Sequence, residues 1–230
     1  MKIKGLQKTT LLDFPGKVAC TVFTFGCNFR CPFCHNASLV LNESEGEISE
    51  EQFFSLLSKR KGIIDGVCIT GGEPLLHKDI VPFMEKIHSM GFLVKLDTNG
   101  SFPDRLKSVV EAGHVDYVAM DIKNTPEKYA LSAGISTDAE AVFESIRFLM
   151  ESGVDYEFRT TVVKELHTLN DILQIAKHIN GAKRYYLQHF KDSGELIEGG
   201  YSAHSTETMK EMLELVKPYV EISGIRGMEE

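Results

Sequence analysis

A strand that runs directly into a cysteine cluster is the part of the sequence that decides the fold. It reads Val18-Ala19-Cys20-Thr21-Val22-Phe23-Thr24-Phe25, followed by Gly26-Cys27-Asn28-Phe29-Arg30-Cys31-Pro32-Phe33-Cys34-His35. β-Branched and aromatic residues dominate the first half, which is typical of a buried parallel strand. The three thiols of the second half can converge on one soft metal centre, because thiolates favour iron–sulfur clusters or zinc. The stretch therefore predicts a metal site after a first strand.

Outward from this stretch, short apolar runs alternate with amphipathic ones and predict an α/β fold. The expected strands cover residues 18–25, 66–70, 93–97, 117–121, 156–163 and 184–188. The expected helices cover residues 49–61, 79–90, 103–112, 138–152, 169–179 and 206–217. No Pro/Ser-rich linker interrupts the series, so residues 1–230 are predicted to form a single parallel α/β domain, either doubly wound or barrel-like.

Local signals mark where several of these helices begin and end. Ser49 with Gln52 three residues later predicts a capping box at the first helix. Four helices run into a glycine, the residue that most easily takes the left-handed conformation after a helix. These glycines are Gly91, Gly113, Gly153 and Gly181.

Polar residues gather toward the carboxyl ends of the predicted strands, the edge at which parallel α/β folds assemble their active sites. The cysteine cluster follows the first strand, Gly71-Gly72-Glu73-Pro74 the second and Asp97-Thr98-Asn99-Gly100 the third. Met120-Asp121-Ile122-Lys123 ends the fourth strand, Arg159-Thr160-Thr161 lies within the fifth, and Gln188-His189 ends the sixth. Their shared position predicts that they belong to one site.

Composition excludes several classes of protein. The 230-residue chain carries a formal net charge of -8, which disfavours a sequence-independent nucleic-acid binder because such a protein needs surplus cations. The beginning of the chain lacks the apolar core of a secretory signal, and no apolar run reaches the ~18 residues of a membrane span. Clustered rather than dispersed cysteines also disfavour a disulfide framework. We therefore expect a cytoplasmic protein with no membrane or nucleic-acid partner.

A metal held by three cysteines would keep one coordination position open. Structural zinc sites are usually closed by four ligands, and the sequence has no second cysteine pair. Cys20 and Cys68 stand alone in predicted strands, where a small buried side chain is the simpler role. His35 could be a fourth zinc ligand, although its adjacency to Cys34 makes tetrahedral binding awkward. Both iron–sulfur and zinc chemistry are compatible with these residues.

The C-x3-C-x-F-C spacing, the Gly-Gly-Glu-Pro run and the strand–helix rhythm together resemble the radical S-adenosylmethionine superfamily. The resemblance implies a partial parallel (βα)6 barrel. It also implies that Cys27, Cys31 and Cys34 hold a [4Fe–4S] cluster, whose fourth iron binds the amino and carboxylate groups of S-adenosylmethionine. An electron from the cluster would then break the carbon–sulfur bond and give methionine and a 5′-deoxyadenosyl radical.

A narrower resemblance, to the activating enzymes of glycyl radical proteins, covers nearly the whole chain. It rests on Thr10-Leu11-Leu12-Asp13-Phe14-Pro15-Gly16, Phe25-Gly26-Cys27-Asn28, Cys34-His35-Asn36, Asp97-Thr98-Asn99-Gly100 and Met120-Asp121-Ile122-Lys123. The Leu-Asp-Phe-Pro-Gly part is most similar to anaerobic ribonucleoside-triphosphate reductase activating proteins. It implies hydrogen abstraction from a glycine of that reductase's large subunit, with flavodoxin or ferredoxin as electron donor. Because no further cysteine clusters follow, one iron–sulfur cluster is expected.

Through the Gly-Gly-Glu-Pro motif, the resemblance implies that Gly71, Gly72 and Glu73 contact the methionine amino group of the cofactor. The chemistry agrees, because glycines allow close backbone approach and a carboxylate suits an ammonium group. A plain strand-to-helix turn is the structural alternative. Phe33 is expected near the adenine, with core packing as its alternative role.

The remaining predicted cofactor-binding residues are Asp97, Asn99, Lys123, Arg159 and His189. Asp97 could accept from ribose hydroxyls or the amino group. Lys123 could pair with the methionine carboxylate or with the substrate peptide, and Arg159 could pair with the methionine carboxylate. His189 could contact adenine or ribose, a role that the neighbouring glutamine could take instead.

Two of these assignments have explicit alternatives. Arg159 could form an internal ion pair with Glu157 or with an aspartate instead of binding the cofactor. Asp97 and Asp121, with Thr98 and Met120, could supply oxygens to a monovalent cation beside the cofactor.

Other classes of protein fit part of the pattern. A small electron carrier would use a cluster without S-adenosylmethionine, but it normally has four cysteine ligands and would not need Glu73, Asp97 or Lys123. A zinc-stabilised interaction module would be colourless and indifferent to air. Among enzymes, the alternatives are an activase of another glycyl radical enzyme, such as pyruvate formate-lyase, and a radical enzyme acting on a small molecule.

Overall fold

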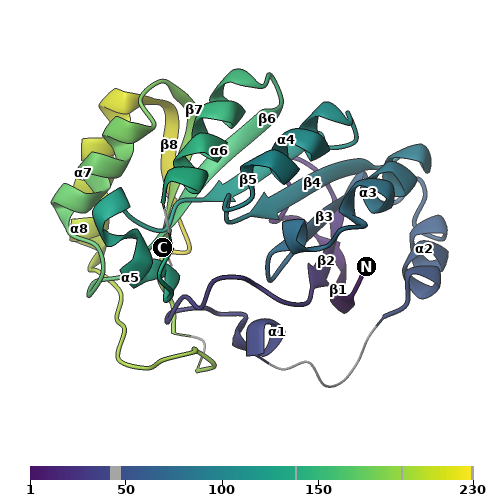
Figure 1. The fold of residues 1–230 in the computed structure, drawn as a ribbon, viewed down its shortest axis with the longest axis horizontal. Coiled ribbons are helices and arrows are strands. Elements are labelled where there is room, and N and C mark those ends of the chain that lie inside the picture. Colours follow the sequence, from purple (N-terminus) through teal and green to yellow (C-terminus); the bar gives the residue numbers. More distant parts are fainter. Residues whose placement is uncertain (42–47, 138, 193, 229–230) are drawn as a thin grey trace. The chain divides into compact units, whose positions relative to one another are not determined.

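The computed structural model describes residues 1–41, 48–137, 139–192 and 194–228, and the chain divides into two compact units. Unit 1 comprises Met1–Asn28, Ser38–Thr98 and Asp104–Val118, and unit 2 comprises Phe29–Ala37, Asn99–Pro103 and Ala119–Glu230. Strands and helices alternate along the chain (Figure 1), and the strand order follows the chain, from β1 to β8. The alternation agrees with the predicted α/β class.

Unit 1 is built on parallel strands with one antiparallel strand at their edge. Its strands are β1 (Ile3–Thr10), β2 (Ala19–Thr24), β3 (Gly66–Gly71) and β4 (Leu93–Thr98). The neighbours β2, β3 and β4 pair in parallel, whereas β1 pairs with β2 in the antiparallel direction. Since β3 and β4 lie in register from Gly66 opposite Leu93, their carboxyl ends bring Gly71 and Asp97 to the same edge of the unit.

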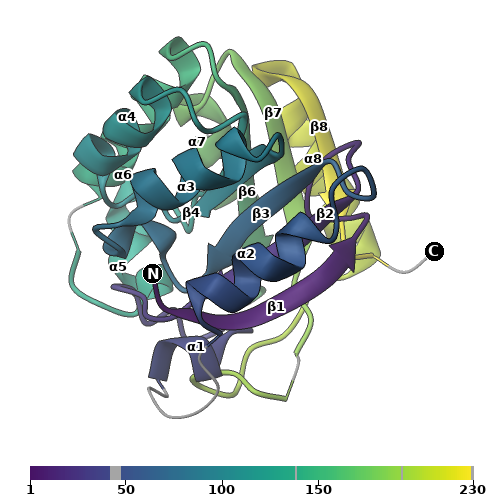
Figure 2. The ribbon, with the colours of Figure 1, turned by 90° about the vertical axis from the view of Figure 1, so that its right-hand side faces the viewer.

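Helices of unit 1 bury an aromatic cluster against these strands. They are α2 (Glu50–Ser58), α3 (Ile80–Ser89), most of α4 (Pro103–Glu111) and most of the short α1 (Ala37–Leu41). Phe53 of α2 stacks on Phe83 of α3 with ring centroids 5.3 Å apart, and Figure 2 shows the two helices on the same side of β3. The predicted capping box is confirmed: Ser49 Oγ accepts from Gln52 N at 3.1 Å, and Gln52 Oε1 accepts from Ser49 N at 3.0 Å.

Unit 2 repeats the strand–helix arrangement. Its elements are the end of β5 (Tyr117–Asp121), α5 (Tyr129–Ala133), α6 (Glu140–Glu151), β6 (Asp155–Val162), α7 (Leu169–His178), β7 (Ala182–His189), α8 (Thr206–Val216) and β8 (Val220–Arg226). β6, β7 and β8 pair in parallel, with Arg159 opposite Tyr186 and Gln188 opposite Arg226. The carboxyl ends of these strands therefore carry Thr161, Gln188 and Arg226 together.

Several elements were not predicted. The antiparallel β1 and the last strand, β8, are absent from the predicted series, as are α1 and α5. β1 contains two lysines and alternates poorly between buried and exposed positions, since it is an edge strand. Predicted residue 138 lies outside the described residues, and α6 begins at Glu140. The single-domain prediction for residues 1–230 stays a prediction.

The four predicted helix-ending glycines do adopt the left-handed conformation. Their φ values are 91° at Gly91, 74° at Gly113, 79° at Gly153 and 89° at Gly181. No helix within the described parts of the chain is long and apolar enough to cross a membrane.

Candidate functional site

In unit 2, backbone hydrogen bonds hold the turn that carries two of the three predicted cluster ligands. Cys34 N donates to Cys31 O at 3.0 Å, and Arg30 N donates to Ala133 O at 2.8 Å. The second bond brings the end of α5 against the cysteine turn. Gly134 permits this approach, since a Cβ there would lie 1.9 Å from Arg30 O.

A segment far along the chain holds the same turn from another direction. Glu198 N donates to Pro32 O at 2.9 Å. The Tyr201 ring meets the edge of the Phe33 ring with centroids 6.5 Å apart, and Phe33 is buried. Sequence reasoning missed Tyr201, because it lies in a polar, glycine-containing stretch with no periodic pattern. The Phe33 side chain therefore packs on protein at one edge, and its expected adenine contact stays a prediction.

All five cysteines are free thiols. Cys27 in unit 1 and Cys34 in unit 2 are partly exposed, whereas Cys31 is buried. Burial raises the pKa of the Cys31 thiol to about 11, an effect that the nearby positive charge of Lys123 reduces. A metal that takes Cys31 as a thiolate must therefore displace a tightly held proton.

An aspartate bridges two cations at the carboxyl end of β5. Asp121 Oδ1 accepts from Arg159 Nε at 2.9 Å, and Asp121 Oδ2 accepts from Lys123 Nζ at 2.9 Å. Burial alone would raise the pKa of Asp121, but the charges of Arg159 and Lys123 outweigh it and hold the pKa below its usual range. Burial would likewise lower the pKa of Lys123, and the Asp121 carboxylate instead raises it. Both cations thus stay charged over the whole physiological range.

This bridge shows that Arg159 forms the internal ion pair considered as its alternative role, while its contact with the cofactor stays a prediction. The internal pairing with an aspartate is present, while Glu157 binds Arg226 through both carboxylate oxygens at 2.7 and 2.8 Å. Asp121 and Lys123 lie two residues apart at the end of a strand, which puts both side chains on the same side and allows them to pair. The sequence offered an aspartate as the partner of Arg159, and the structure identifies it as Asp121.

A histidine side chain forms a hydrogen bond with the backbone carbonyl of Lys123. Val163 N donates to His167 Nδ1 at 3.0 Å, which makes Nδ1 an acceptor and leaves the proton on Nε2. His167 Nε2 then donates to Lys123 O at 2.8 Å. His204 Nε2 donates to His167 O at 2.8 Å, and His189 Nε2 donates to His204 O at 2.9 Å. One ring nitrogen of His189 is thus bound to backbone, and its expected contact with adenine or ribose stays a prediction.

In unit 1, the glycine pair after β3 packs directly against the backbone that precedes Cys27. Gly72 N donates to Thr24 O at 3.0 Å and Glu73 N donates to Gly26 O at 2.7 Å. A Cβ on Gly72 would lie 1.9 Å from Gly26 O, and Gly71 has a φ of 113° that only glycine adopts readily. These glycines therefore position the start of the cysteine stretch, whatever else they contact.

Glu73 is fully buried and organises the turn after β3. Its Oε1 accepts from Leu75 N at 3.0 Å and from Thr98 Oγ1 at 2.8 Å. The structural alternative of a strand-to-helix turn is thus realised. The expected contact of Glu73 with the cofactor amino group stays a prediction.

A buried lysine holds the carboxylate of Asp97. Lys95 is 1% exposed and its Nζ donates to Asp97 Oδ1 and, at 3.7 Å, to Cys68 Sγ. Cys68 Sγ lies 3.8 Å from Asp97 Oδ1. Sequence reasoning missed Lys95, although a lysine two residues before an aspartate in an apolar strand places both on one face. It also treated Cys68 only as a buried hydrophobe.

The suggested monovalent cation site draws on carboxylates that already bind protein cations. Asp97 pairs with Lys95 in unit 1, and Asp121 pairs with two cations in unit 2. Asn99 uses its Oδ1 to accept from Ser101 N at 3.0 Å and from Ser101 Oγ at 2.6 Å, which shapes a turn. The roles of Asp97 and Asn99 in cofactor binding stay predictions.

The residues present fit an iron–sulfur cluster by their donor chemistry. The protein offers free thiols at Cys27, Cys31 and Cys34, the soft ligands that such clusters require. Lys123, whose charge acts on Cys31, would offset the negative charge of bound thiolates. Within the described residues, no group of three His, Cys, Asp or Glu side chains is already arranged around a metal position. Cys31 and Cys34 share a turn in unit 2, and Cys27 belongs to unit 1.

Comparison with protein families shows which superfamily the chain belongs to. The profile of the radical SAM superfamily matches residues 21–179, and the chain therefore belongs to that superfamily. Its members use a [4Fe–4S] cluster and S-adenosylmethionine, so this protein is an enzyme of radical chemistry with these two cofactors. The predicted fold class, the partial parallel barrel of the radical SAM type, is confirmed.

Relatives by sequence include a Methanocaldococcus jannaschii protein named "Putative glycyl-radical enzyme activating enzyme", which is 29% identical over 97% of this chain and 95% of its own length. The pyruvate formate-lyase-activating enzyme of Clostridium pasteurianum is 28% identical over 55% of this chain and 54% of its own length. Among solved structures, Streptococcus suis SuiB bound to S-adenosylmethionine has a TM-score of 0.70 at 13% identity, covering 89% of this chain and 49% of SuiB. That likeness concerns the fold alone.

Proposed function

We propose that this protein activates a glycyl radical enzyme. The observation that carries the proposal is the match to the M. jannaschii relative, which extends over 97% of this chain and bears the name of an activating enzyme of that class. The narrower resemblance of the cysteine stretch, the Asp97–Gly100 run and the Met120–Lys123 run points the same way.

We further propose anaerobic ribonucleoside-triphosphate reductase as the partner. Support comes from the Leu-Asp-Phe-Pro-Gly segment, residues 12–16, which is most similar to the activating proteins of that reductase. A reduced flavodoxin or ferredoxin is the proposed electron donor. The reaction consumes one electron and one S-adenosylmethionine, transfers a hydrogen atom from a glycine Cα to the adenosyl group, and releases methionine and 5′-deoxyadenosine.

The chain's own residues would bind and orient the reactants. When bound, the cluster and S-adenosylmethionine supply the electron and the carbon radical. Cys27, Cys31 and Cys34 would ligate the cluster. Lys123 and Arg159 are charged at all physiological pH values, which suits the methionine carboxylate, and Asp121 keeps them in place. Gly71, Gly72 and Glu73 would receive the amino group, and Phe33, Asp97, Asn99 and His189 would complete the cofactor-binding set.

The proposal is tested by anaerobic reconstitution with iron and sulfide, followed by addition of dithionite and S-adenosylmethionine. 5′-Deoxyadenosine is measured with and without the reductase, and the glycyl radical is measured by electron paramagnetic resonance. We expect the glycyl radical, with 5′-deoxyadenosine above the amount formed without partner, only when the reductase is present with an intact target glycine. Cofactor cleavage without any glycyl radical on the reductase or on pyruvate formate-lyase would instead indicate a small-molecule substrate.

The ligand assignment is tested by single cysteine substitutions. Cys27→Ala, Cys31→Ala and Cys34→Ala should lose the cluster absorbance and all 5′-deoxyadenosine. Cys20→Ala and Cys68→Ala are the matched controls, since both thiols are fully buried within unit 1. A control that loses the cluster as completely as the three ligand variants would contradict the assignment.

A further inference from the structure

The loop between β1 and β2 is held by side-chain hydrogen bonds. Thr10 Oγ1 accepts from Leu12 N at 3.2 Å and from Asp13 N at 3.3 Å. Asp13 Oδ2 accepts from Thr21 Oγ1 at 2.5 Å, and Phe14 is buried at 4% exposure. The chain is thus fixed on both sides of the tip. This loop contains the segment on which the reductase resemblance rests, and the reaction chemistry gives it no role.

The fixed loop presents two leucines to solvent. Leu11 is 71% exposed and Leu12 is 90% exposed. Leaving such a side chain in water forgoes the stabilisation that its burial would contribute. Thr10, Asp13 and Phe14 stabilise the fold of the loop through their hydrogen bonds and burial. Leu11 and Leu12 are mostly exposed and contribute little to it. Exposed adjacent apolar side chains on a rigid loop are typical of an interaction surface.

A second loop, residues 59–65, lies directly beside the first. Asp65 N donates to Val18 O at 2.7 Å, and Val18 N donates to Asp65 Oδ2 at 2.8 Å. Arg60 Nη1 reaches Thr9 Oγ1 at 3.5 Å. Ile63 at the tip of this second loop is 61% exposed. Both loops lie where β1 ends and β2 and β3 begin (Figure 2), and both belong to unit 1.

The charges of the two loops are basic, against the overall charge of -8. Lys17, Lys59 and Lys61 are exposed, and Arg60 is half-buried. The two carboxylates present, Asp13 and Asp65, each accept a hydrogen bond from within the unit. We name this surface the apolar–basic patch; it comprises Leu11, Leu12, Lys17, Arg60, Lys61 and Ile63.

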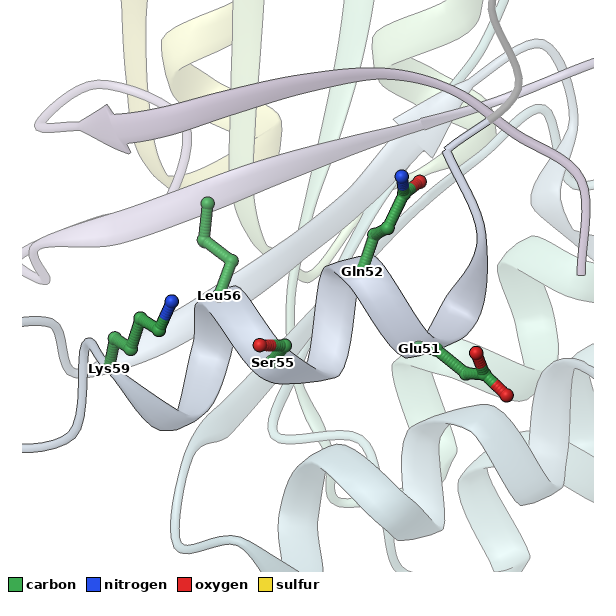
Figure 3. A pocket seen from close by; sticks show the side chains of 5 residues that line it. All are labelled: Glu51, Gln52, Ser55, Leu56 and Lys59. Carbon is green, nitrogen blue, oxygen red and sulfur yellow. The ribbon is translucent and has the colours of Figure 1, made fainter.

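A hollow on α2 continues the patch. It has a volume of about 410 Å³ and is lined by Glu51, Gln52, Ser55, Leu56 and Lys59. Figure 3 shows Leu56 and Lys59 along the side of α2, with Lys59 at the end from which the basic loop departs. The patch therefore has exposed apolar side chains next to a hollow. A complementary protein surface could pack against both.

The patch is remote from the glycine turn in the same unit. The strand β3 runs from Gly66, next to the second loop, to Gly71, at the cofactor edge. At about 3.3 Å per residue, these ends are roughly 17 Å apart. Contacts at the patch are therefore separate from contacts at Gly71–Glu73, so substitutions in the patch can weaken an anchor without altering the cofactor edge.

We propose that the apolar–basic patch is the anchor for the glycyl radical enzyme, which meets it with an acidic surface that contains an apolar pocket for Leu11 and Leu12. The inference rests on the proposed function. Two copies of this chain would oppose lysines and arginine to one another, and like charges disfavour that contact. An acidic partner gains from the same charges and is drawn to the patch in an otherwise acidic protein.

The test compares the double variant Leu11→Ser/Leu12→Ser and the double variant Lys17→Glu/Lys61→Glu with the wild type. Leu131→Ser is the control, because Leu131 is 57% exposed on α5 in unit 2 and lies outside the patch. Three quantities are measured: 5′-deoxyadenosine formed without partner, the Kd for anaerobic ribonucleotide reductase by calorimetry, and glycyl radical yield. Sedimentation velocity reports the oligomeric state.

We expect both patch variants to keep the partner-free cleavage rate within twofold and to raise the Kd at least tenfold. Radical yield should fall at low reductase concentration and recover at high concentration. Raising the salt from 50 to 300 mM should weaken wild-type binding more than that of Lys17→Glu/Lys61→Glu.

If the wild type activates the reductase and both variants bind it as the wild type does, the anchor is overturned while the proposed function stands. If the wild type neither binds nor activates the reductase, the reductase is not the partner, and the anchor for it is overturned as well. A wild-type dimer that the leucine variant dissociates would also overturn the anchor, since the patch would then join two copies of this chain.

Discussion

A methyl group added at Gly72 would clash with the backbone of Gly26, which cannot move aside as a flexible side chain could. The added Cβ would overlap Gly26 O, the carbonyl just before Cys27. We expect Gly72→Ala to lower the free energy of unfolding by on the order of 3 kcal/mol and to reduce the iron retained after reconstitution. Urea unfolding and iron analysis check both effects.

The control for this substitution is Gly199→Ala. Nothing lies within 4 Å of a Cβ there, and its φ is not in the left-handed region. It should leave stability and iron content unchanged. If Gly72→Ala proved as stable and as iron-rich as Gly199→Ala, the packing of the glycine pair against Gly26 would not position the cysteine stretch.

Removing the charge of Asp121 should destabilise unit 2. Asp121→Asn leaves Lys123 and Arg159, with side chains only 14% and 12% exposed, without their shared carboxylate. Because Asp121 itself is 27% exposed, the expected loss is about 1–3 kcal/mol, below that of a fully buried pair. Denaturant unfolding measures it.

Glu140→Gln provides the matched comparison, since the Glu140–Arg147 pair is 68% and 59% exposed. Its effect should stay below about 1 kcal/mol. Equal effects of the two substitutions would mean that the bridge at Asp121 contributes no more than a surface pair does.

Site residues could be predicted from the sequence only where they belong to a contiguous local motif. Gly71, Gly72 and Glu73 were predicted from a contiguous run, and the structure gives the run a tight backbone packing. Lys95 was missed although it lies on the same face of β4 as Asp97, because a lone lysine in an apolar strand belongs to no recognised motif. Tyr201 was missed because its partner Phe33 comes from a distant segment. A contact such as Tyr201 with Phe33 depends on the path of the whole chain, which no local pattern encodes.

At the scale of an element, the start of α7 depends on one carboxylate. Asp171 Oδ2 accepts from Thr168 N at 2.8 Å, from Thr168 Oγ1 at 2.7 Å and from Lys128 Nζ at 2.8 Å. Burial would raise the pKa of Asp171, but Lys128 and the Thr168 bonds outweigh it and lower the pKa below 3.8. The stabilisation by this carboxylate is therefore full above pH 3.8 and is lost as the pH falls below it.

We expect Asp171→Asn to lower the free energy of unfolding by about 1–2 kcal/mol at pH 7. The difference from wild type should persist at pH 5 and shrink below pH 4. Urea curves at several pH values measure it, with Glu214→Gln as control because its pair with Lys217 is exposed. A difference that grew on acidification would contradict the sign of the pKa shift.

Elements with strong periodicity were predicted closely. Strand β5 (Tyr117–Asp121) and the beginnings of α4, α7 and α8 coincide with the predicted residues. The strands at the two ends of the order were missed for a physical reason. β1 and β8 each have a neighbour on one side only and expose much of their length, so neither carries the apolar run of a buried strand.

For the whole molecule, cofactor binding should appear as thermal stabilisation. S-Adenosylmethionine at 100 times its Kd adds about 2.7 kcal/mol to the folded state. For a chain of this size that corresponds to a rise in Tm of about 5–10 °C. Differential scanning fluorimetry under argon, with the reconstituted protein, measures the shift.

Cys34→Ala is the informative control for this shift. Without its cluster the protein should show little stabilisation by S-adenosylmethionine, since the cofactor's amino and carboxylate groups would lose their iron. The same rise in Tm in wild type and Cys34→Ala would show that the cofactor binds independently of the cluster.

The contacts of Pro32 and Phe33 with Glu198 and Tyr201 have a consequence for biosynthesis. The cysteine turn is synthesised well before Glu198 and Tyr201, which hold it in the folded protein. During synthesis, Cys31 and Cys34 therefore lie in a turn that lacks two of its contacts until residue 201 has been added. We expect cluster insertion into the completed turn only after that point.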